Sequence, residues 1–367
     1  MLNTLEVDRI QFAELDAQIL HLEHQLAELQ SKRAVVKARL DASKYPVLTI
    51  PSEIISEIFL HFLPPYPQCP PLTGVDSPTT LTHICSVWRE IALSTPQLWR
   101  AITVADIDSG RLHIAEAWLS QSGCHPLSLL VHDRIGDDVE RQILRAALIS
   151  QRARFENLIS ICSESQADLS ILDGPMPLLH HLELDMWSRG VSVTQEIAPL
   201  LRSAVLSDTA CVLAQLPWKQ LTSLTLQWGL GMEFVTILQQ TPNLLRCVLL
   251  VTSAGGPPLP EVRLPLLGSL TLGTELEMTE ERMFFSLITP ALHTLRVSEQ
   301  CLGEDPVESL SSFISRSACR LNKLCIIHHE DGPLRSLEQY QFALPTISNI
   351  SARSESDAET DDGMSHG

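Results

Sequence analysis

The sequence is poor in basic residues and has no long apolar segment. It carries 26 Lys and Arg against 44 Asp and Glu, which gives a formal net charge of −18 over 367 residues. Nucleic-acid backbones and anionic membranes are bound through clustered Lys and Arg, so we expect neither as a partner. No apolar run reaches the ~20 residues that a transmembrane helix needs. The first residues show no basic stretch followed by an apolar block, so we expect an intracellular protein of the cytoplasm, the nucleus or both.

Familiar catalytic and metal-binding motifs are also missing. The nine cysteines are scattered and form no C-x-x-C pair, which argues against a disulfide framework or a cysteine-rich zinc site. There is no G-x-S-x-G, H-E-x-x-H, Walker or G-x-G-x-x-G motif. The densest group of ligand-type side chains is 328–331, but neighbours on a strand point to opposite faces, so we expect no metal there. We therefore expect a protein that is not an enzyme and has no cofactor.

The chain does have apolar residues in quantity, and their pattern changes along the sequence. Hydrophobic residues make up 44% of the chain, enough for a sizeable core. The patterns divide the chain into four segments. They are a heptad helix at 1–44, a small helical domain at 45–104, a repetitive region at 105–345 and an acidic tail at 346–367. The tail has few apolar residues, and we expect it to be disordered.

The first segment predicts a single long helix with a coiled-coil seam. Apolar residues recur in steps of three and four at Phe12, Leu15, Ile19, Leu22, Leu26, Leu29, Val36 and Leu40, with Arg33 as the polar interruption. Residues 1–30 carry six acids and one base, whereas residues 31–44 carry five bases and one acid. An antiparallel copy would set unlike charges together. A homodimer through 12–40 is thus one interpretation, and a helix that folds back on its own chain is the alternative.

The second segment predicts two amphipathic helices on either side of a proline-rich loop. Pro51 suits the first helical position, where its missing N–H costs nothing. Six prolines between 64 and 78 indicate an extended loop. Ser77-Pro78 then restarts a helix as its cap and first residue.

Three motifs of this segment together resemble an F-box. They are Ile50-Pro51-Ser52-Glu53-Ile54-Ile55, Val87-Trp88-Arg89-x-Ile91-Ala92 and Pro96-x-Leu98-Trp99. The loop at 64–80 is longer and richer in proline than the usual F-box link. The resemblance implies that the segment binds a Skp-family adaptor through exposed members of an apolar set, while the other members form its own core. The set is Ile50, Pro51, Ile54, Ile55, Ile58, Phe59, Val87, Trp88, Leu98 and Trp99.

The third segment contains a repeated pattern, L-x-x-L-x-L, often with a proline two residues earlier. The first leucines stand at 179, 201, 221, 244, 267, 292 and 321, which is the spacing of leucine-rich repeats. The helical patterns between copies predict units of one short strand and one helix. The expected fold class is therefore α/β: a long N-terminal helix, a small all-α F-box and a solenoid of short parallel strands alternating with helices. The asparagine typical of such repeats is missing, so we expect an irregular solenoid.

Two tryptophans follow repeat strands directly. Trp187 and Trp228 come three and two residues after the last leucine of their copies. Aromatic side chains at the rim of a solenoid could anchor a partner protein, and they could equally pack beneath a loop. They are the candidate substrate-binding residues.

The order of a heptad helix, an F-box and leucine repeats resembles the large F-box families of mushroom-forming fungi. The resemblance implies a substrate-recruiting subunit of an SCF-type cullin–RING ubiquitin ligase, with the repeats binding an unknown protein substrate. The alternative is a leucine-repeat scaffold without a ligase role. Most of the negative charge falls in the repeat region, which favours a basic substrate.

Overall fold

The structure of the chain is a computed structural model that describes residues 2–42, 46–105, 109–132, 138–162, 170–186, 190–252, 258–274, 281–328 and 337–354. The chain divides into two compact units, 1–58 and 59–367. The boundary lies inside helix α2 (Ser52–Phe62), which begins in the first unit and ends in the second.

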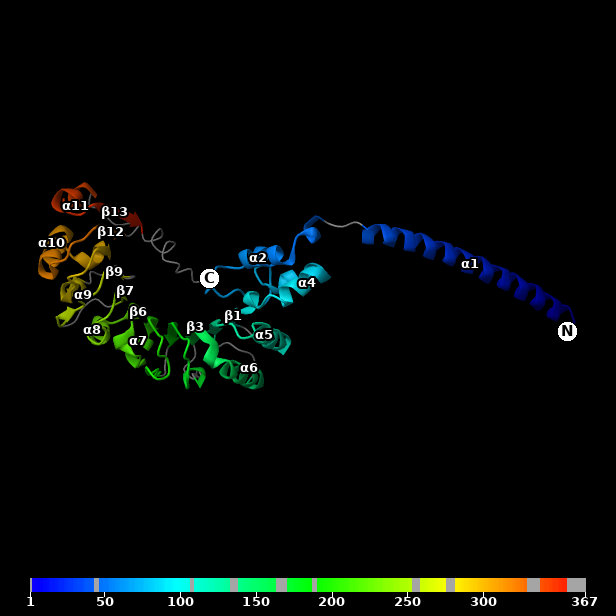
Figure 1. Cartoon of the computed structure of the whole chain (residues 1–367), viewed down its shortest axis with the longest axis horizontal. Coiled ribbons are helices and arrows are strands. Elements are labelled where there is room, and N and C mark those ends of the chain that lie inside the picture. The colour runs from blue at the N-terminus through cyan, green and yellow to red at the C-terminus, as the bar shows by residue number, and fades with distance from the viewer. Residues whose placement is uncertain are drawn as a thin grey trace. The chain divides into compact units, whose positions relative to one another are not determined.

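The first unit is dominated by helix α1 (Leu2–Ala42), drawn in dark blue in Figure 1. Its sequence has no proline or glycine to interrupt the helix, and Glu28 and Lys32, four residues apart, form an ion pair at 2.6 Å. Every side chain from residue 7 to residue 40 is exposed, so the apolar stripe of the heptad pattern faces outward along its whole length. A short 3-10 turn, η1 (Pro46–Thr49), precedes α2.

The second unit begins with the end of α2, a proline-rich loop and two short helices where one was predicted. These are α3 (Thr79–Ile84) and α4 (Ser86–Leu93), followed by the 3-10 turn η2 (Pro96–Trp99). The single helix predicted from Ser77-Pro78 is therefore wrong at Cys85, whose backbone is extended (φ −156°, ψ 170°). The Cys85 Sγ accepts a hydrogen bond from the Trp88 N–H at 3.5 Å, so this residue caps the start of α4.

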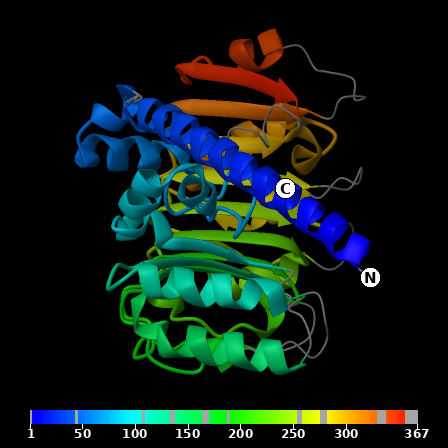
Figure 2. The same cartoon turned by 90° about the vertical axis from the view of Figure 1, so that its right-hand side faces the viewer.

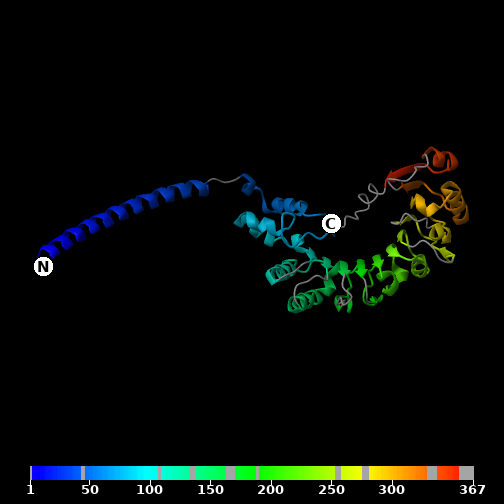
Figure 3. The same cartoon turned by 180° about the vertical axis from the view of Figure 1, so that it is seen from behind.

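The rest of the second unit is a large parallel sheet whose strands follow one another in chain order, with helices in between. Figures 1 and 3 show helices α5 to α10 along the outer face of the curved sheet, and Figure 2 shows the strands stacked as a ladder. The eleven strands are β1 (Ala101–Val104), β2 (Leu127–His132), β3 (Phe155–Cys162), β4 (His181–Met186), β5 (Ser203–Asp208), β6 (Ser223–Gly229), β7 (Arg246–Val251), β9 (Ser269–Thr274), β11 (Thr294–Ser298), β12 (Lys323–His328) and β13 (Asn349–Ser354). The predicted α/β class, with a long N-terminal helix, is confirmed.

Most of the segments between these strands contain a helix or a 3-10 turn, as the sequence pattern predicts, but the described residues between β4 and β5 and between β7 and β9 contain neither. The helices and turns are α5 (Ser109–Gln121), α6 (Asp138–Ser150), η3 (Arg152–Arg154), η4 (Ser170–Leu172), α7 (Ala210–Leu213), η5 (Trp218–Gln220), α8 (Gly231–Leu238), α9 (Glu281–Ser286), η6 (Glu299–Leu302), α10 (Pro306–Ser317) and α11 (Leu337–Ala343). A second, two-stranded sheet pairs β8 (Val262–Arg263) with β10 (Leu287–Ile288). The connections differ in length and type from one strand to the next.

The proline that precedes many copies of the leucine pattern forms a recurring turn. The Leu179 N–H donates to the Met176 carbonyl at 3.1 Å, which places Pro177 second in a four-residue turn, the position that favours proline. The same bond recurs where Pro199, Pro242, Pro265 and Pro290 stand second in their turns. Each turn therefore sends the chain into the next strand in the same way.

The repeated leucines form the core of this unit. All seven first leucines, from Leu179 to Leu321, are buried, as are the two positions that follow each of them in the pattern. Because side chains alternate along a strand, the residues between those two positions face away from the helices. The pattern thus fixes which side of every strand is buried.

The sheet extends beyond the predicted limits at both ends. Strand β1 (Ala101–Val104) pairs with β2, although 45–104 was assigned to the helical domain. Strand β13 (Asn349–Ser354) pairs with β12 over its whole length, so the predicted disorder from residue 346 is wrong up to 354. The remaining residues of the predicted tail lie outside the described residues.

Candidate protein-binding surfaces

The face of the sheet opposite the helices forms a groove of about 840 Å³. Small polar side chains from successive strands dominate its centre, among them Ser203, Ser223, Thr225, Ser269 and Thr271. They lie near one another because the strands pair in register. Ser203 pairs with Ser223, and Val248 of β7 pairs with Thr225 on one side and Thr271 on the other. A polar groove with exposed side chains suits an extended peptide or a protein loop.

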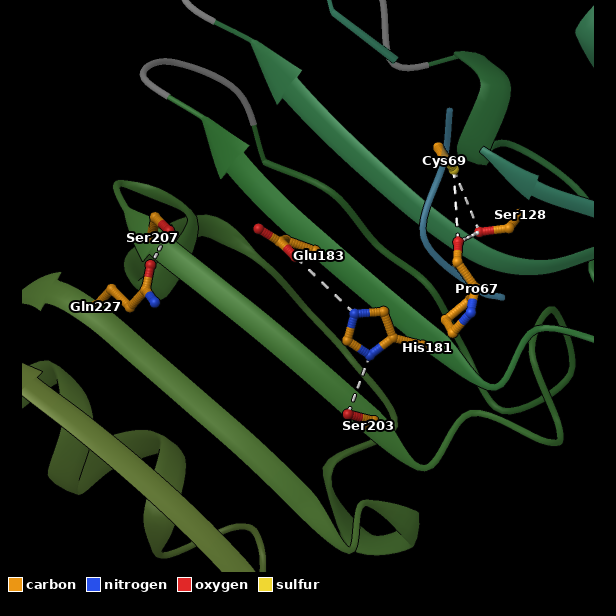
Figure 4. Close-up of polar contacts among 8 residues, drawn as sticks. All are labelled: Pro67, Cys69, Ser128, His181, Glu183, Ser203, Ser207 and Gln227. Atoms are coloured by element: carbon orange, nitrogen blue, oxygen red, sulfur yellow. Dashed lines mark hydrogen bonds and ion pairs between the residues drawn. The ribbon is translucent and has the colours of Figure 1, made fainter. Parts of the chain in front are cut away.

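The proline-rich loop covers the groove face of the first strands. The Thr103 N–H donates to the Pro70 carbonyl at 3.2 Å, and the Thr103 hydroxyl donates to the Cys69 carbonyl at 3.0 Å. The Ser128 hydroxyl donates to the Pro67 carbonyl at 2.6 Å and lies 3.4 Å from the Cys69 Sγ (Figure 4). Burial raises the pKa of the Cys69 thiol, which favours its protonated form.

Tyr66 fixes the same loop to strand β3. Its hydroxyl donates to the Glu156 carboxylate at 2.6 Å, and the Arg100 guanidinium stacks 3.8 Å from its ring centroid. Burial, with a further contribution from Glu156, raises the pKa of Tyr66 well above its usual value. The proline-rich loop is therefore part of the groove wall.

A histidine, a carboxylate and a serine meet on strands β4 and β5. The His181 Nδ1 lies 3.1 Å from the Ser203 hydroxyl, and its Nε2 lies 4.0 Å from the Glu183 carboxylate (Figure 4). Nearby, the buried Ser207 hydroxyl lies 3.1 Å from the Gln227 side-chain oxygen. Sequence reasoning missed these groups, although His181 and Glu183 stand at the two-residue spacing that puts both on one face of a strand.

Basic side chains lie on the groove face of the later strands. Arg246, Arg296 and Lys323 come from β7, β11 and β12. Among the described residues of β7 to β13, the side chains on this face include no carboxylate, in contrast to Glu183 on β4. The overall acidity of the repeat region therefore does not extend to this part of the groove.

Of the two candidate tryptophans, the structure describes only Trp228, and this residue does not line the groove. Trp187 falls outside the described residues. Trp228 is half-buried at an irregular position in β6, with a left-handed backbone (φ 55°), and is not among the residues that line the groove. The prediction that these two residues anchor a substrate stays a prediction, and nothing at Trp228 adds to it.

The apolar residues of α2 divide into a buried and an exposed set. Ile55 and Phe59 are 2% and 1% exposed, whereas Ile54 and Ile58 are 52% and 51% exposed. Phe62, the next residue four positions on, is also exposed. A four-residue spacing places Ile54, Ile58 and Phe62 on one side of the helix, which is therefore an apolar stripe open to a partner.

The later motif residues divide in the same way. The Phe59 ring packs edge-on against Trp88, with the ring centroids 4.9 Å apart. The Trp99 ring packs edge-on against Trp118, with the ring centroids 5.3 Å apart. The Trp99 indole N–H donates to the Ala92 carbonyl at 2.9 Å, and Leu98 is buried.

The expected adaptor residues are thereby sorted. Four belong to the core, namely Ile55, Phe59, Leu98 and Trp99; four are exposed, namely Pro51, Ile54, Ile58 and Val87; Ile50 and Trp88 are half-buried.

The described residues offer no site for a metal ion, since they contain no group of three His, Cys, Asp or Glu side chains that could hold one. Their cysteines are free, and most are buried, with Cys124 exposed. Among the described helices, none is both long and apolar enough to cross a membrane. The chain matches no family model and no curated protein.

Proposed function

We propose that this chain is an F-box protein, the substrate-recruiting subunit of an SCF-type cullin–RING ubiquitin ligase. The observation that carries the proposal is the division of the motif residues in two. Ile55, Phe59, Leu98 and Trp99 are buried, while Ile54 and Ile58 of the same motif are exposed. A buried half supports the fold, and an exposed apolar half is what binding to a Skp-family adaptor requires.

The groove is the proposed substrate site, and the repeats around it form an irregular leucine-rich-repeat solenoid. The chain contributes proximity: it holds a substrate protein beside the ubiquitin-conjugating enzyme and so raises the effective concentration of substrate lysines. Arg246, Arg296 and Lys323 favour an acidic substrate segment over the later strands, rather than the basic one that the overall charge suggests.

The Ser203–His181–Glu183 group does not favour a hydrolase. In a catalytic triad the nucleophile and the carboxylate both lie within hydrogen-bond distance of the histidine ring. Here the Glu183 carboxylate oxygen lies 4.0 Å from the His181 Nε2, which is too far for a hydrogen bond. The Ser203 N–H donates to the His180 carbonyl at 3.1 Å and is not free to stabilise an oxyanion. The group therefore fits a polar binding surface.

The test is co-purification of the full chain with a Skp-family adaptor, before and after the change Ile54→Asp with Ile58→Asp. Both side chains are exposed, so the variant keeps its core, and the loss of two apolar contacts of about 2 kcal/mol each should abolish recovery of the adaptor. Val212→Asp is the matched control, since Val212 is 57% exposed on α7. Failure of the unchanged chain to bind any adaptor would favour the scaffold alternative, and equal binding by the variant would refute the assigned surface.

A further inference from the structure

Helix α1 carries an apolar seam that is exposed from end to end. The seam runs from Phe12 to Leu40, which is about 42 Å of helix at 1.5 Å per residue. All its apolar members are at least half exposed. A continuous stripe of this size on a helix surface calls for a partner, and its seven-residue repeat is that of a two-stranded coiled coil.

We propose that a second copy of this chain covers the seam and that the two α1 helices pair antiparallel. The proposal goes beyond the ubiquitin-ligase function and does not depend on it. Arg33 provides the first argument, because it occupies an a position of the heptad pattern. In a parallel pair the same a positions face each other, so two Arg33 guanidinium groups would meet in the apolar seam without a counter-charge.

In an antiparallel pair each a position faces a d position of the other copy. With Leu26 opposite Leu29, Arg33 lies opposite Leu22 of the other helix. Glu23 follows Leu22 directly and carries a carboxylate at the edge of the seam, within reach of a long arginine side chain. The antiparallel arrangement thus removes a like-charge contact and supplies a partner for the buried charge.

The flanking charges favour the same orientation. Asp16 and Lys37 both occupy e positions, and in the antiparallel register they face each other at both ends of the pair. In a parallel pair Lys37 would instead face Lys32 of the other copy, because g and e positions are then neighbours. The separation of an acidic first part from a basic last part within one helix is what an antiparallel homodimer uses.

Such a pair has a structural consequence for the rest of the chain. The two copies leave the coiled coil at opposite ends, so each second unit and its groove is attached at a different end. Two binding surfaces in one particle raise the effective concentration for a partner that contains two recognition segments.

The orientation can be tested by reversing one charge in the full chain. Lys37→Glu places two carboxylates together in an antiparallel pair, and we expect the dimer dissociation constant to rise on the order of tenfold. In a parallel pair the same change sets the new carboxylate against Lys32 of the other copy and strengthens the dimer. The double variant Asp16→Lys with Lys37→Glu restores the antiparallel contact with its signs exchanged, so its dissociation constant should return toward that of the unchanged chain.

Sedimentation equilibrium of each full-length variant measures these constants. Glu14→Lys is the matched control, since position 14 faces away from the seam and should change the dissociation constant little. Circular dichroism checks that α1 remains helical. A dimer strengthened by Lys37→Glu would overturn the antiparallel arrangement, and an unchanged chain that stays monomeric at about 100 µM would overturn the dimer itself.

Discussion

Strand β7 offers a direct test of the assignment of buried and groove faces, because two neighbouring aliphatic residues point to opposite sides. Leu249 is fully buried on the helix side, whereas Val248 is half-buried and lines the groove. Leu249→Ala removes buried methyl groups and leaves a cavity, which should lower the free energy of unfolding by about 2 to 5 kcal/mol. Val248→Ala should cost about 1 kcal/mol or less, since its side chain already contacts solvent.

Urea unfolding, followed by circular dichroism and by tryptophan fluorescence, measures both variants against the unchanged chain. Because each repeat is stabilised by its neighbours, Leu249→Ala should also increase amide exchange in β6 and β9, the strands on either side of β7. A one-residue shift of the strand would exchange the two faces. An equal or larger loss for Val248→Ala would therefore refute the alternation on which the groove is built.

Two further predictions concern groups within the second unit. Burial raises the pKa of the Cys247 thiol to about 12, so at pH 8 iodoacetamide should modify the exposed Cys124 well before Cys247, as read by mass spectrometry. In the unfolded chain this thiol ionises near pH 9, and its ionisation stabilises the unfolded state. The free energy of unfolding should therefore fall as the pH rises from about 9 toward 12. An equal free energy of unfolding at pH 8 and pH 11 would contradict the burial of Cys247. Tyr66→Phe leaves the half-buried Glu156 without its donor and should cost about 1 to 3 kcal/mol, with faster cleavage of the proline-rich loop in limited proteolysis. Cleavage at an unchanged rate would show that the loop is held elsewhere.

The repeated leucines could be predicted from sequence because their spacing reports burial directly. A residue such as Leu226 must be apolar to lie under the helices, and its two-residue spacing from Leu224 identifies a strand. The final repeat was missed although it has the same form: Pro345-x-Ile347-x-x-Ile350-x-Ala352 matches the earlier copies, and the Ile347 N–H makes the same turn to the Leu344 carbonyl at 3.1 Å. The polar, acidic composition around it hid the pattern, while the exposed edge of β12 supplies the hydrogen-bonding partners that order it.

Tertiary contacts decide what local patterns leave open. The three- and four-residue spacing of α2 marks Ile54 and Ile55 alike as apolar, and only the packing of the folded unit shows that Ile55 is buried and Ile54 exposed. The break at Cys85 is equally invisible to helix propensity, because a helix ending and restarting within one residue depends on the cap that Cys85 gives to Trp88. The His181–Ser203 contact joins residues of different repeats, and its geometry follows from strand register alone.

The proline-rich loop has a consequence for the proposed function. Ubiquitin transfer by proximity works best when the adaptor-binding helices hold the substrate at a defined distance, because a flexible link dilutes the effective concentration. In this chain the stretch that leads from α2 to α3 is bound at successive points to the sheet: Tyr66 to Glu156, Pro67 to Ser128, and Cys69 with Pro70 to Thr103. Proline limits the freedom of the unfolded loop, so ordering it costs less entropy. These hydrogen bonds fasten the loop before α3 to the sheet at several points, which favours the fixed spacing that the proposed function would use.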